Sequence, residues 1–205
     1  MSPEQIGARI AALVDGAEPQ ESFGQLTVDV PAQRWAEAAL AVRDDDEVSC
    51  GFFDWLSAYD DPDAPGEDGT AGAGGLAVVL HVWSNRHRHH LLLRTRVARD
   101  GATLPTLTSV WPGAAWHERE TYEMFGVVFD GHPNLVPLLL PDGFEGHPLR
   151  KEFVLASRVA KAWPGAKEPG ESDHDLRGAS GRRRMLPPGV PAPDEWGPDA
   201  AGEQP

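Results

Sequence analysis

The chain has 205 residues, a formal net charge of -14 at pH 7 and one cysteine, Cys50. A single cysteine excludes an internal disulfide, a CxxC redox pair and a four-cysteine iron–sulfur or zinc site held by this chain alone. The acidic excess argues against electrostatic binding of nucleic acid or of an anionic membrane surface, and it leaves open a partner with a basic surface.

Neither a membrane span nor a targeting segment is predicted. The longest apolar stretches, 74–80 and 135–140, are far shorter than the roughly 20 residues that cross a bilayer. Residues 1–14 lack the basic head and apolar core of a secretion signal. The sequence therefore predicts a soluble protein of the reducing cytoplasm.

The first part of the chain predicts a helix, a strand and a second helix. Apolar residues spaced by three and four favour a short amphipathic helix over residues 5–14. Alternating apolar and polar residues over 23–30 are typical of a half-buried strand. Helical spacing then resumes after Pro31 and continues to the acidic run 44–47.

A loop and an antiparallel pair of strands follow. Residues 60–75 are mostly Asp, Pro, Gly, Ala and Glu, a composition that predicts a flexible surface loop. Its glycines precede a strand rather than a helix, so they do not predict a nucleotide-phosphate site. Residues 76–83 and 90–97 predict a hairpin joined by the turn 84–89. Residues 107–110 predict a further short strand.

Three histidines, His87, His89 and His90, lie around the predicted hairpin turn. Clustered imidazoles could bind a metal ion. The alternative is a solvated turn, because no carboxylate or thiolate is interleaved and because Arg86 and Arg88 would repel a cation. The sequence favours the solvated turn.

The last part of the chain, residues 156–205, differs in composition. It is rich in Pro and Gly and lacks long periodic apolar runs, which predicts an extended or disordered C-terminal tail. This tail either orders along a partner or stays solvated, and both alternatives remain open. The predicted fold class is α+β: a single domain over residues 1–155 with a mixed or antiparallel sheet packed by helices, followed by the tail.

Residues 111–153 contain most of the specific information. The stretch from Ala114 to Phe125 has strong helix formers and no Pro or Gly, which favours a helix. Its large apolar residues point in different directions around the helix with charges between them, which predicts a helix surrounded by neighbours. Arg119 and Glu123, four residues apart, are expected to pair on it.

The charged residues of this helix suggest two kinds of enzyme. His117 and Glu118 would begin the zinc-binding helix of a metalloprotease, but the second histidine of that motif would stand at Thr121, so the motif fails. Glu118 and Glu120 could act as general acid and base, yet the sequence supplies no nucleophile or oxyanion donor beside them.

Two copies of Gly-His-Pro, centred on His132 and His147, follow the helix. Each glycine permits a bend and each proline holds its histidine extended, so both copies predict fixed turns. Together with Asp130 and Asp142 the two histidines form a candidate metal site, although plain turn histidines are the simpler interpretation.

The motifs of this segment stand in a fixed order: Trp116-His117-Glu118-Arg119-Glu120, Tyr122-Glu123-Met124-Phe125-Gly126, Phe129-Asp130-Gly131-His132-Pro133, Leu139-Leu140-Pro141 and Gly146-His147-Pro148-Leu149-Arg150-Lys151. This order resembles the signature of the 30 kDa subunit family (the C-subunit) of respiratory complex I, the proton-pumping NADH-quinone oxidoreductase. One stretch departs from the family: before Leu-Leu-Pro, where the family usually has basic residues, this chain has Asn134-Leu135-Val136-Pro137.

The resemblance implies a scaffold in the peripheral arm of the complex, at the cytoplasmic side of the cell membrane. Its implied partners are the quinone-site subunit, the subunit holding the last iron–sulfur cluster and other peripheral-arm subunits. The complex transfers electrons from NADH to quinone and couples this to proton translocation, with NADH, FMN, iron–sulfur clusters and quinone bound by other subunits.

The resemblance assigns no catalytic, cofactor-binding or metal-binding residue to this chain. It implies that the signature residues determine folding and interfaces. These residues are Trp116, Glu118, Arg119, Glu120, Tyr122, Glu123, Met124, Phe125, Gly126, Gly131, His132, Pro133, Pro141, Gly146, His147, Pro148, Arg150 and Lys151.

Two further functions remain open on the sequence. One is a stand-alone metal-dependent hydrolase that uses His117, Glu118, Glu120 and the two Gly-His-Pro histidines. The other is an acidic protein-binding module unrelated to respiration. Metal analysis would support the first, and a pull-down without respiratory subunits would support the second.

Overall fold

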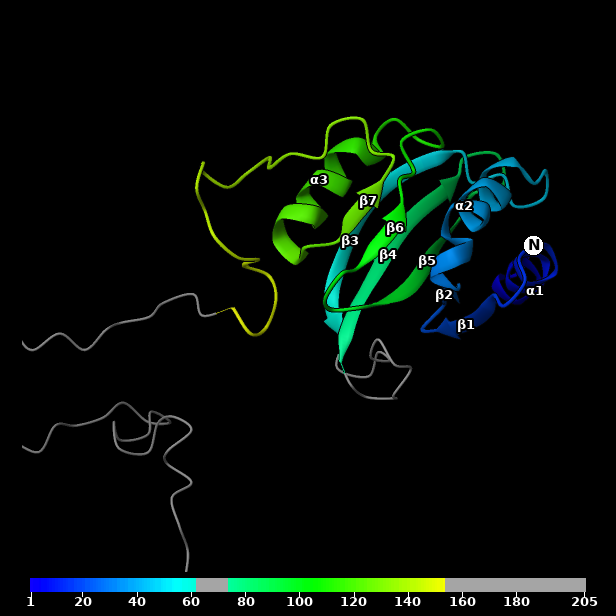
Figure 1. The fold of residues 1–205 in the computed structure, drawn as a ribbon. Coiled ribbons are helices and arrows are strands. Elements are labelled where there is room, and N and C mark those ends of the chain that lie inside the picture. The colour runs from blue at the N-terminus through cyan, green and yellow to red at the C-terminus, as the bar shows by residue number, and fades with distance from the viewer. Residues whose placement is uncertain (62–73, 154–205) are drawn as a thin grey trace, which may run out of the picture. The chain divides into compact units, whose positions relative to one another are not determined.

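The computed structural model describes residues 1–61 and 74–153 (Figure 1). The predicted tail at 156–205 and most of the predicted loop at 60–75 lie outside this range. The two ends of that loop are strand residues, since Asp61 ends one strand and Gly75 begins the next. Within the described residues, no helix is both long enough and apolar enough to cross a membrane.

A five-stranded mixed sheet is the centre of the fold, in the order β1-β2-β5-β4-β3. The strands are β1 (Glu18–Ser22), β2 (Gln25–Asp29), β3 (Phe52–Asp61), β4 (Gly75–Ser84) and β5 (His89–Ala98). Neighbouring strands pair antiparallel except β2 and β5, which are parallel. The predicted hairpin is confirmed as β4 and β5, and the α+β fold class with a mixed sheet is confirmed as well.

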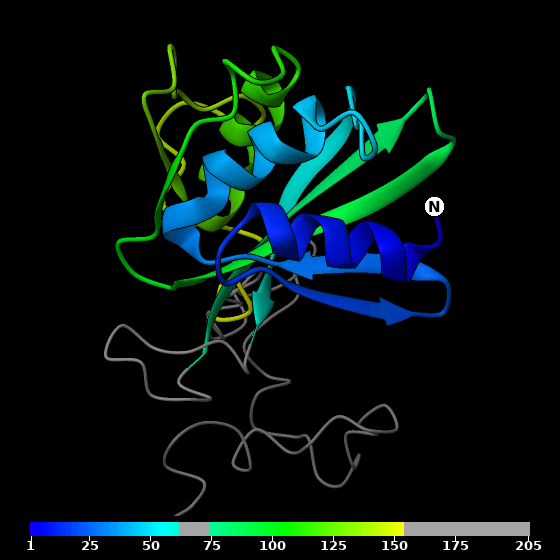
Figure 2. The same cartoon turned by 90° about the vertical axis from the view of Figure 1, so that its right-hand side faces the viewer.

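Helices α1 (Pro3–Leu13) and α2 (Trp35–Asp44) lie side by side on one face of the sheet (Figure 2). A capping box starts α1: the Gln5 amide N–H donates to the Ser2 hydroxyl, and the Gln5 side chain accepts from the Ser2 N–H. A short 3-10 helix, η1 (Ala32–Arg34), leads into α2. Both helices were predicted, and both bury the residues at helical spacing against the strands.

Helix α3 (Ala114–Phe125) packs against β3, beside a second small sheet of two parallel strands (Figure 1). These strands are β6 (Thr103–Pro105) and β7 (Val128–Asp130). The predicted bounds of the α3 helix are confirmed at both ends. Two residues of β3, Phe53 and Leu56, turn toward α3, where the His117 imidazole lies 5.2 Å from the Phe53 ring.

Two predictions differ from the structure. The strand predicted over 107–110 is wrong, because the N–H groups of Val110 and Trp111 both donate to the Leu107 carbonyl at 2.9 Å and close a turn. Strand β1 was not predicted at all. Its five residues are all exposed and mostly polar, so it lacks the alternation that marks a half-buried strand.

Cys50, in the segment that joins α2 to β3, is fully buried, and its thiol lies 3.7 Å from the Val48 carbonyl oxygen. Burial raises the pKa of this thiol to about 12. The one cysteine of the chain is therefore a small apolar core residue that stays protonated at neutral pH.

Candidate functional site

The C-terminal end of α3 is closed by the second Gly-His-Pro segment. The last carbonyl oxygens of a helix have no partner within the helix and need donors from elsewhere. Here the Glu123 carbonyl accepts from His147 Nδ1 at 2.9 Å, the Met124 carbonyl from the Leu149 N–H at 3.2 Å, and the Phe125 carbonyl from Arg150 Nε at 2.7 Å. An arginine at this end also interacts favourably with the helix dipole.

Gly126 ends α3 in the left-handed conformation, with φ of +79°. A Cβ atom at this position would stand 2.6 Å from both Arg150 Nη2 and His147 Nε2. Glycine is therefore required twice, by the backbone angle and by the two side chains that cap the helix.

Glu123 holds the loop that follows the first Gly-His-Pro. Its carboxylate accepts the N–H groups of Leu138, Leu139 and Leu140 at 3.2, 2.9 and 2.7 Å. Burial alone would raise the pKa of Glu123, but these three donors and the nearby Arg119 guanidinium outweigh it, so the pKa lies below its ordinary value. The carboxylate is thus kept charged as an acceptor for backbone amides.

Arg119 binds the same loop from the carbonyl side. Its guanidinium donates to the carbonyl oxygens of Val136 and Pro137, both at 2.9 Å, and lies 5.8 Å from the Trp116 ring centroid. Arg119 and Glu123 were predicted to pair with each other, but each instead binds backbone groups of this loop. Arg119 donates to carbonyl oxygens of the loop, and Glu123 accepts from its backbone N–H groups.

Glu118 is fully buried beneath the first Gly-His-Pro. Its carboxylate accepts the Leu107 N–H at 2.6 Å and the Thr106 hydroxyl, and lies 3.9 Å from His132 Nε2. Burial raises its pKa, and the two hydrogen bonds offset this only in part. His132 itself donates from Nε2 to the Ala115 carbonyl at 3.1 Å and accepts the Asn134 N–H on Nδ1 at 3.0 Å.

The end of the signature is tied to the sheet. The Lys151 N–H donates to the Asp60 carboxylate at 2.8 Å, and Arg150 donates to the Arg99 carbonyl at 3.0 Å. Arg99 in turn pairs with Asp60 and with Glu152. Thr106, Asp60 and Arg99 are contributors that the sequence did not identify, because nothing in their local sequence marks a partner so far along the chain.

The signature residues thus differ widely in exposure. Glu118, Glu123 and Phe125 are buried. The half-buried members are Arg119, Glu120, Tyr122, Met124, Gly126, His132, His147, Pro148 and Arg150, and the exposed members are Trp116, Gly131, Pro133, Pro141, Gly146 and Lys151. Trp116 is 63% exposed, so the described residues leave that side of α3 uncovered.

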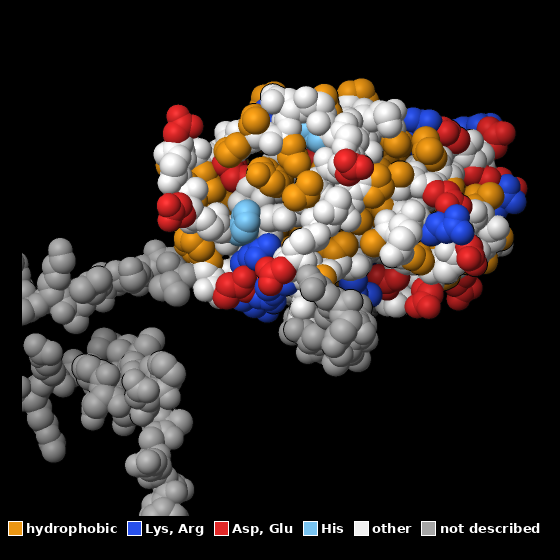
Figure 3. Space-filling model, in the orientation of Figure 1, with side chains coloured by type: hydrophobic (Ala, Val, Ile, Leu, Met, Phe, Trp, Pro, Cys, Tyr) orange, Lys and Arg blue, Asp and Glu red, His pale blue; other side chains and the backbone are white. Residues whose placement is uncertain are grey.

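Apolar side chains gather on the outside of α3 and of the loop that it holds. They are Trp116, Val136, Leu139, Phe144 and Leu149, which we call the α3 patch. Beside it lies a hollow of about 240 Å³, lined in part by Tyr122, Pro137, Leu140 and Phe144. Figure 3 shows hydrophobic side chains grouped over the α3 end of this face. An exposed apolar group of this kind is typical of a protein interface.

The candidate metal sites do not form. In residues 1–61 and 74–153, no group of three or more His, Cys, Asp or Glu side chains is arranged to hold a metal ion. Of the turn histidines, His87 and His89 contact the carbonyl oxygens of Asp46 and Val48, both at 2.8 Å. His90 turns instead to His81. The hydrolase alternative is therefore not favoured.

Comparison with known proteins agrees with this geometry. The family "Respiratory-chain NADH dehydrogenase, 30 Kd subunit" matches residues 28–159, more than half of the chain. The NADH-quinone oxidoreductase C-subunit of Roseiflexus castenholzii is 38% identical over 157 residues, 76% of this chain and 86% of the relative. The corresponding C-subunit of Salinispora tropica is 40% identical over 146 residues, 71% of this chain and 56% of the relative.

Two solved structures are similar. A trypsin-resistant fragment of Nqo5 is 27% identical with a TM-score of 0.53, over 66% of this chain and 100% of the fragment. A chain of the membrane-bound sulfane sulfur reductase, an archaeal respiratory membrane complex, shares the fold at 22% identity with a TM-score of 0.62, over 84% of this chain and 99% of that one. The sequence match over 28–159, with the helix and capping loop that its signature builds, shows that the chain belongs to the 30 kDa subunit family of respiratory-chain NADH dehydrogenase, the C-subunit family of NADH-quinone oxidoreductase.

Proposed function

We propose that the chain is a non-catalytic scaffold subunit in the peripheral arm of a proton-pumping NADH-quinone oxidoreductase, respiratory complex I. In this proposal the complex transfers electrons from NADH to quinone and couples the transfer to proton translocation. Other subunits bind NADH, FMN, the iron–sulfur clusters and quinone. Membership of the 30 kDa subunit family supports the proposal.

One observation carries it: the charged signature side chains bind the chain's own backbone, while apolar side chains remain outside. Glu123, Arg119 and Arg150 use their hydrogen bonds to fix a helix end and a loop. A catalytic carboxylate or guanidinium would instead face the reacting group. The α3 patch that this arrangement presents is suited to bind another protein.

The proposed partners are the quinone-site subunit, the subunit holding the last iron–sulfur cluster and further peripheral-arm subunits. The chain would lie at the cytoplasmic side of the cell membrane and reach the membrane only through these partners. Within the proposal, the buried signature residues determine folding, and the exposed ones, together with the α3 patch, determine contact with partners.

Co-purification tests the proposal. The full chain carries an affinity tag in cells that make the complex, and the complex is extracted from membranes with a mild detergent. We expect the other subunits, and NADH-quinone oxidoreductase activity, to accompany the tag. Recovery of the wild-type chain solely as a free monomer would contradict the proposal.

A substitution on the α3 patch sharpens this test. Leu139→Ser removes a side chain that is 59% exposed, so it should leave the isolated fold intact and reduce recovery of partners by about threefold or more. The matched control is Leu40→Ser on α2, where the leucine is 42% exposed outside the patch. Equal recovery of partners by the two variants would remove the α3 patch from the interface.

A further inference from the structure

The face of the five-stranded sheet that is turned away from the helices carries a cluster of aromatic rings. On β4, Leu80 and Val82 are buried in the core, so the alternating His81 and Trp83 point to the opposite face. The strand register sets Trp55 of β3 opposite His81, and His90 of β5 opposite Trp83. Four rings from three strands therefore share this face.

The rings contact one another and remain partly open to solvent. The centroid of the His81 ring lies 5.8 Å from that of Trp55 and 5.7 Å from that of Trp83. Trp83 stacks on His90 with centroids 4.4 Å apart and planes inclined by 21°. Both tryptophans are 36% exposed. Two large indole rings that are held in place and reach solvent cost little entropy to bind, which is typical of binding hot spots.

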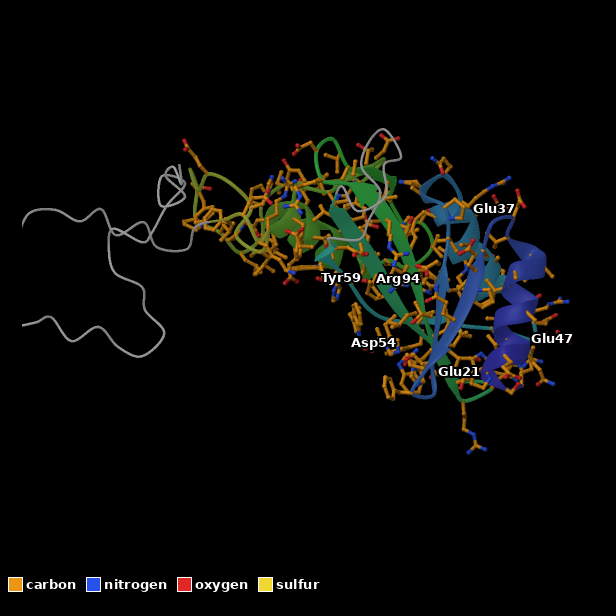
Figure 4. The ribbon with its side chains drawn as sticks, turned by 90° about the horizontal axis from the view of Figure 1, so that it is seen from below. Glu21, Glu37, Glu47, Asp54, Tyr59 and Arg94 are labelled. Atoms are coloured by element: carbon orange, nitrogen blue, oxygen red, sulfur yellow. The ribbon has the colours of Figure 1, made fainter. Side chains whose placement is uncertain are left out.

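A β-bulge adds a carboxylate to the rings. The register of β3 against β4 shifts between Phe53 and Trp55, so Asp54 is the extra residue. Its Oδ2 lies 2.7 Å from His81 Nδ1, which places it on the same face as the rings, and its side chain is still 42% exposed. Figure 4 shows Asp54, Tyr59 and Arg94 together beside the strands, away from α1. We call Asp54, Trp55, His81, Trp83 and His90 the sheet cluster.

Hydrogen-bond contacts hold the two imidazole rings of the sheet cluster in place. His81 Nδ1 donates to Asp54, and His81 Nε2 lies 2.9 Å from His90 Nδ1. Burial and the neighbouring His81 lower the pKa of His90, which keeps this ring neutral at pH 7. The sheet cluster thus presents a carboxylate and two indole faces to solvent.

We propose that the sheet cluster is the docking point for an arginine or lysine side chain of a neighbouring subunit in the same complex. A guanidinium or ammonium group is the common protein group that pairs with a carboxylate and binds indole faces at once. The chain's net charge of -14 also favours a partner with a basic surface. The inference rests on the proposed function, because it takes the partner from that complex.

The sheet cluster is separate from the α3 patch. Phe53 and Leu56 of β3 face α3, whereas Asp54 and Trp55 between them face the opposite way. One strand thus has α3 on one side and the sheet cluster on the other. A chain with docking surfaces on both sides of β3 is able to bridge two neighbouring subunits.

Photo-crosslinking in the assembled complex identifies the occupant. A photoreactive phenylalanine analogue replaces Trp83 in the full chain, and a second sample carries it at Leu40 as the control. We expect the Trp83 position to crosslink to a peptide of another subunit that contains Arg or Lys. A crosslink to a second copy, to the three consecutive arginines Arg182, Arg183 and Arg184 of the same chain, or to nothing while the chain still co-purifies would overturn the inference.

A charge-neutral substitution tests the chemistry. Asp54→Asn keeps the shape and the acceptor oxygen for His81 but removes the charge. We expect it to weaken retention of the chain in the purified complex by about fivefold, with a smaller effect as salt rises. The control is Asp15→Asn, since the Asp15 side chain is 92% exposed elsewhere on the surface. Equal retention of both variants would contradict a cationic occupant.

The two proposals fail in different ways. If the wild-type chain never co-purifies with respiratory subunits, the proposed function fails. If it co-purifies, and neither the crosslink nor the Asp54→Asn effect is found, the proposed function stands and the role of the sheet cluster fails. The melting temperature of isolated Asp54→Asn, expected to match that of the wild type, separates a docking effect from a loss of folding.

Discussion

Two regions of this protein are stabilised in different ways. In the layer formed by α1, α2 and the five-stranded sheet, apolar residues at regular spacing are buried against one another, as Ile6, Ile10 and Trp35 are. In the region around α3, charged side chains bind backbone groups of a loop with little secondary structure. The first region gains its stability mainly from burial, and the second adds directed hydrogen bonds to the burial of residues such as Phe125 and Phe129.

The two regions are also expected to differ in how well they tolerate substitutions. A buried apolar side chain is replaced with moderate loss by another of similar volume, because burial is not directional. A carboxylate that accepts three amides has no such substitute, because both its charge and its geometry are used. The α3 region is therefore expected to depend on residue identity, and the helical layer on volume and polarity.

The largest loss is expected from the helical layer. Trp35→Ala should lower the free energy of unfolding by about 3–5 kcal/mol, because it opens a cavity at a fully buried position. Denaturant unfolding measures the change. Leu40→Ala on the same helix, at a half-exposed position, is the control and should cost less than about 1 kcal/mol. Similar losses in the two variants would contradict a core built by burial.

The second largest loss of stability is expected from Gly126→Ala, and comparison with Gly24→Ala separates the effect of backbone strain from that of side-chain clash. We expect a loss of about 2–4 kcal/mol, since the new methyl group meets Arg150 and His147 at a backbone angle suited to glycine. Gly24→Ala has the same φ of +79° with nothing within 4 Å of the added atom, and should cost only about 1 kcal/mol. Thermal unfolding compares them, and equal losses would mean that capping adds nothing.

Glu123→Gln tests the hydrogen bonds of the loop. We expect a loss of about 2 kcal/mol at neutral pH and faster hydrogen exchange of the amides of Leu138, Leu139 and Leu140. The folded pKa of Glu123 is depressed, so its stabilisation is complete above the ordinary glutamate pKa and is lost as pH falls through the folded pKa.

The difference between wild type and Glu123→Gln should therefore shrink as pH falls from about 6 to about 3. Unfolding measured over this range gives the comparison. Glu37→Gln, at an exposed position, is the control and should follow the wild type within about 0.5 kcal/mol. A difference that grows toward acid pH would refute the assignment of Glu123 as a charged acceptor.

The smallest loss is expected from Arg119→Ala. It removes two hydrogen bonds to partly exposed carbonyl oxygens, so isolated stability should fall by about 1 kcal/mol. Recovery of respiratory partners should fall more, because the loop that carries the α3 patch loses its support. Arg86→Ala, on the hairpin turn, is the matched control. Normal amounts of assembled complex in Arg119→Ala cells would contradict this prediction.

The same contrast decides what the sequence could predict. Periodicity identified α1, β2 and α2, because each buries one face against the core. The β4–β5 hairpin was predicted from two strand-like segments joined by a short polar turn. Strand β1 is exposed throughout, so it leaves no periodic signal. At 107–110 the buried Leu107 and Val110 resembled a strand, but a turn buries both equally well.

Within the α3 region, local sequence predicted the helix and its glycine-permitted turns but not its partners. The bounds of α3 follow from helix formers between Gly113 and Gly126. The bond from Arg150 to the Phe125 carbonyl and that from Lys151 to Asp60 span distances along the chain that spacing rules do not reach. The family signature marked these residues as important without indicating what they bind.

Alkylation of the buried Cys50 thiol can be used to measure how often the core of this protein opens. A thiol reacts as the thiolate, and with its pKa raised to about 12 and no exposure, Cys50 should be unreactive in the closed core. Alkylation at neutral pH then requires that the core around Cys50 opens, so its rate measures how often that opening occurs. Since the chain has no other cysteine, every label identifies this event without the need for mutation.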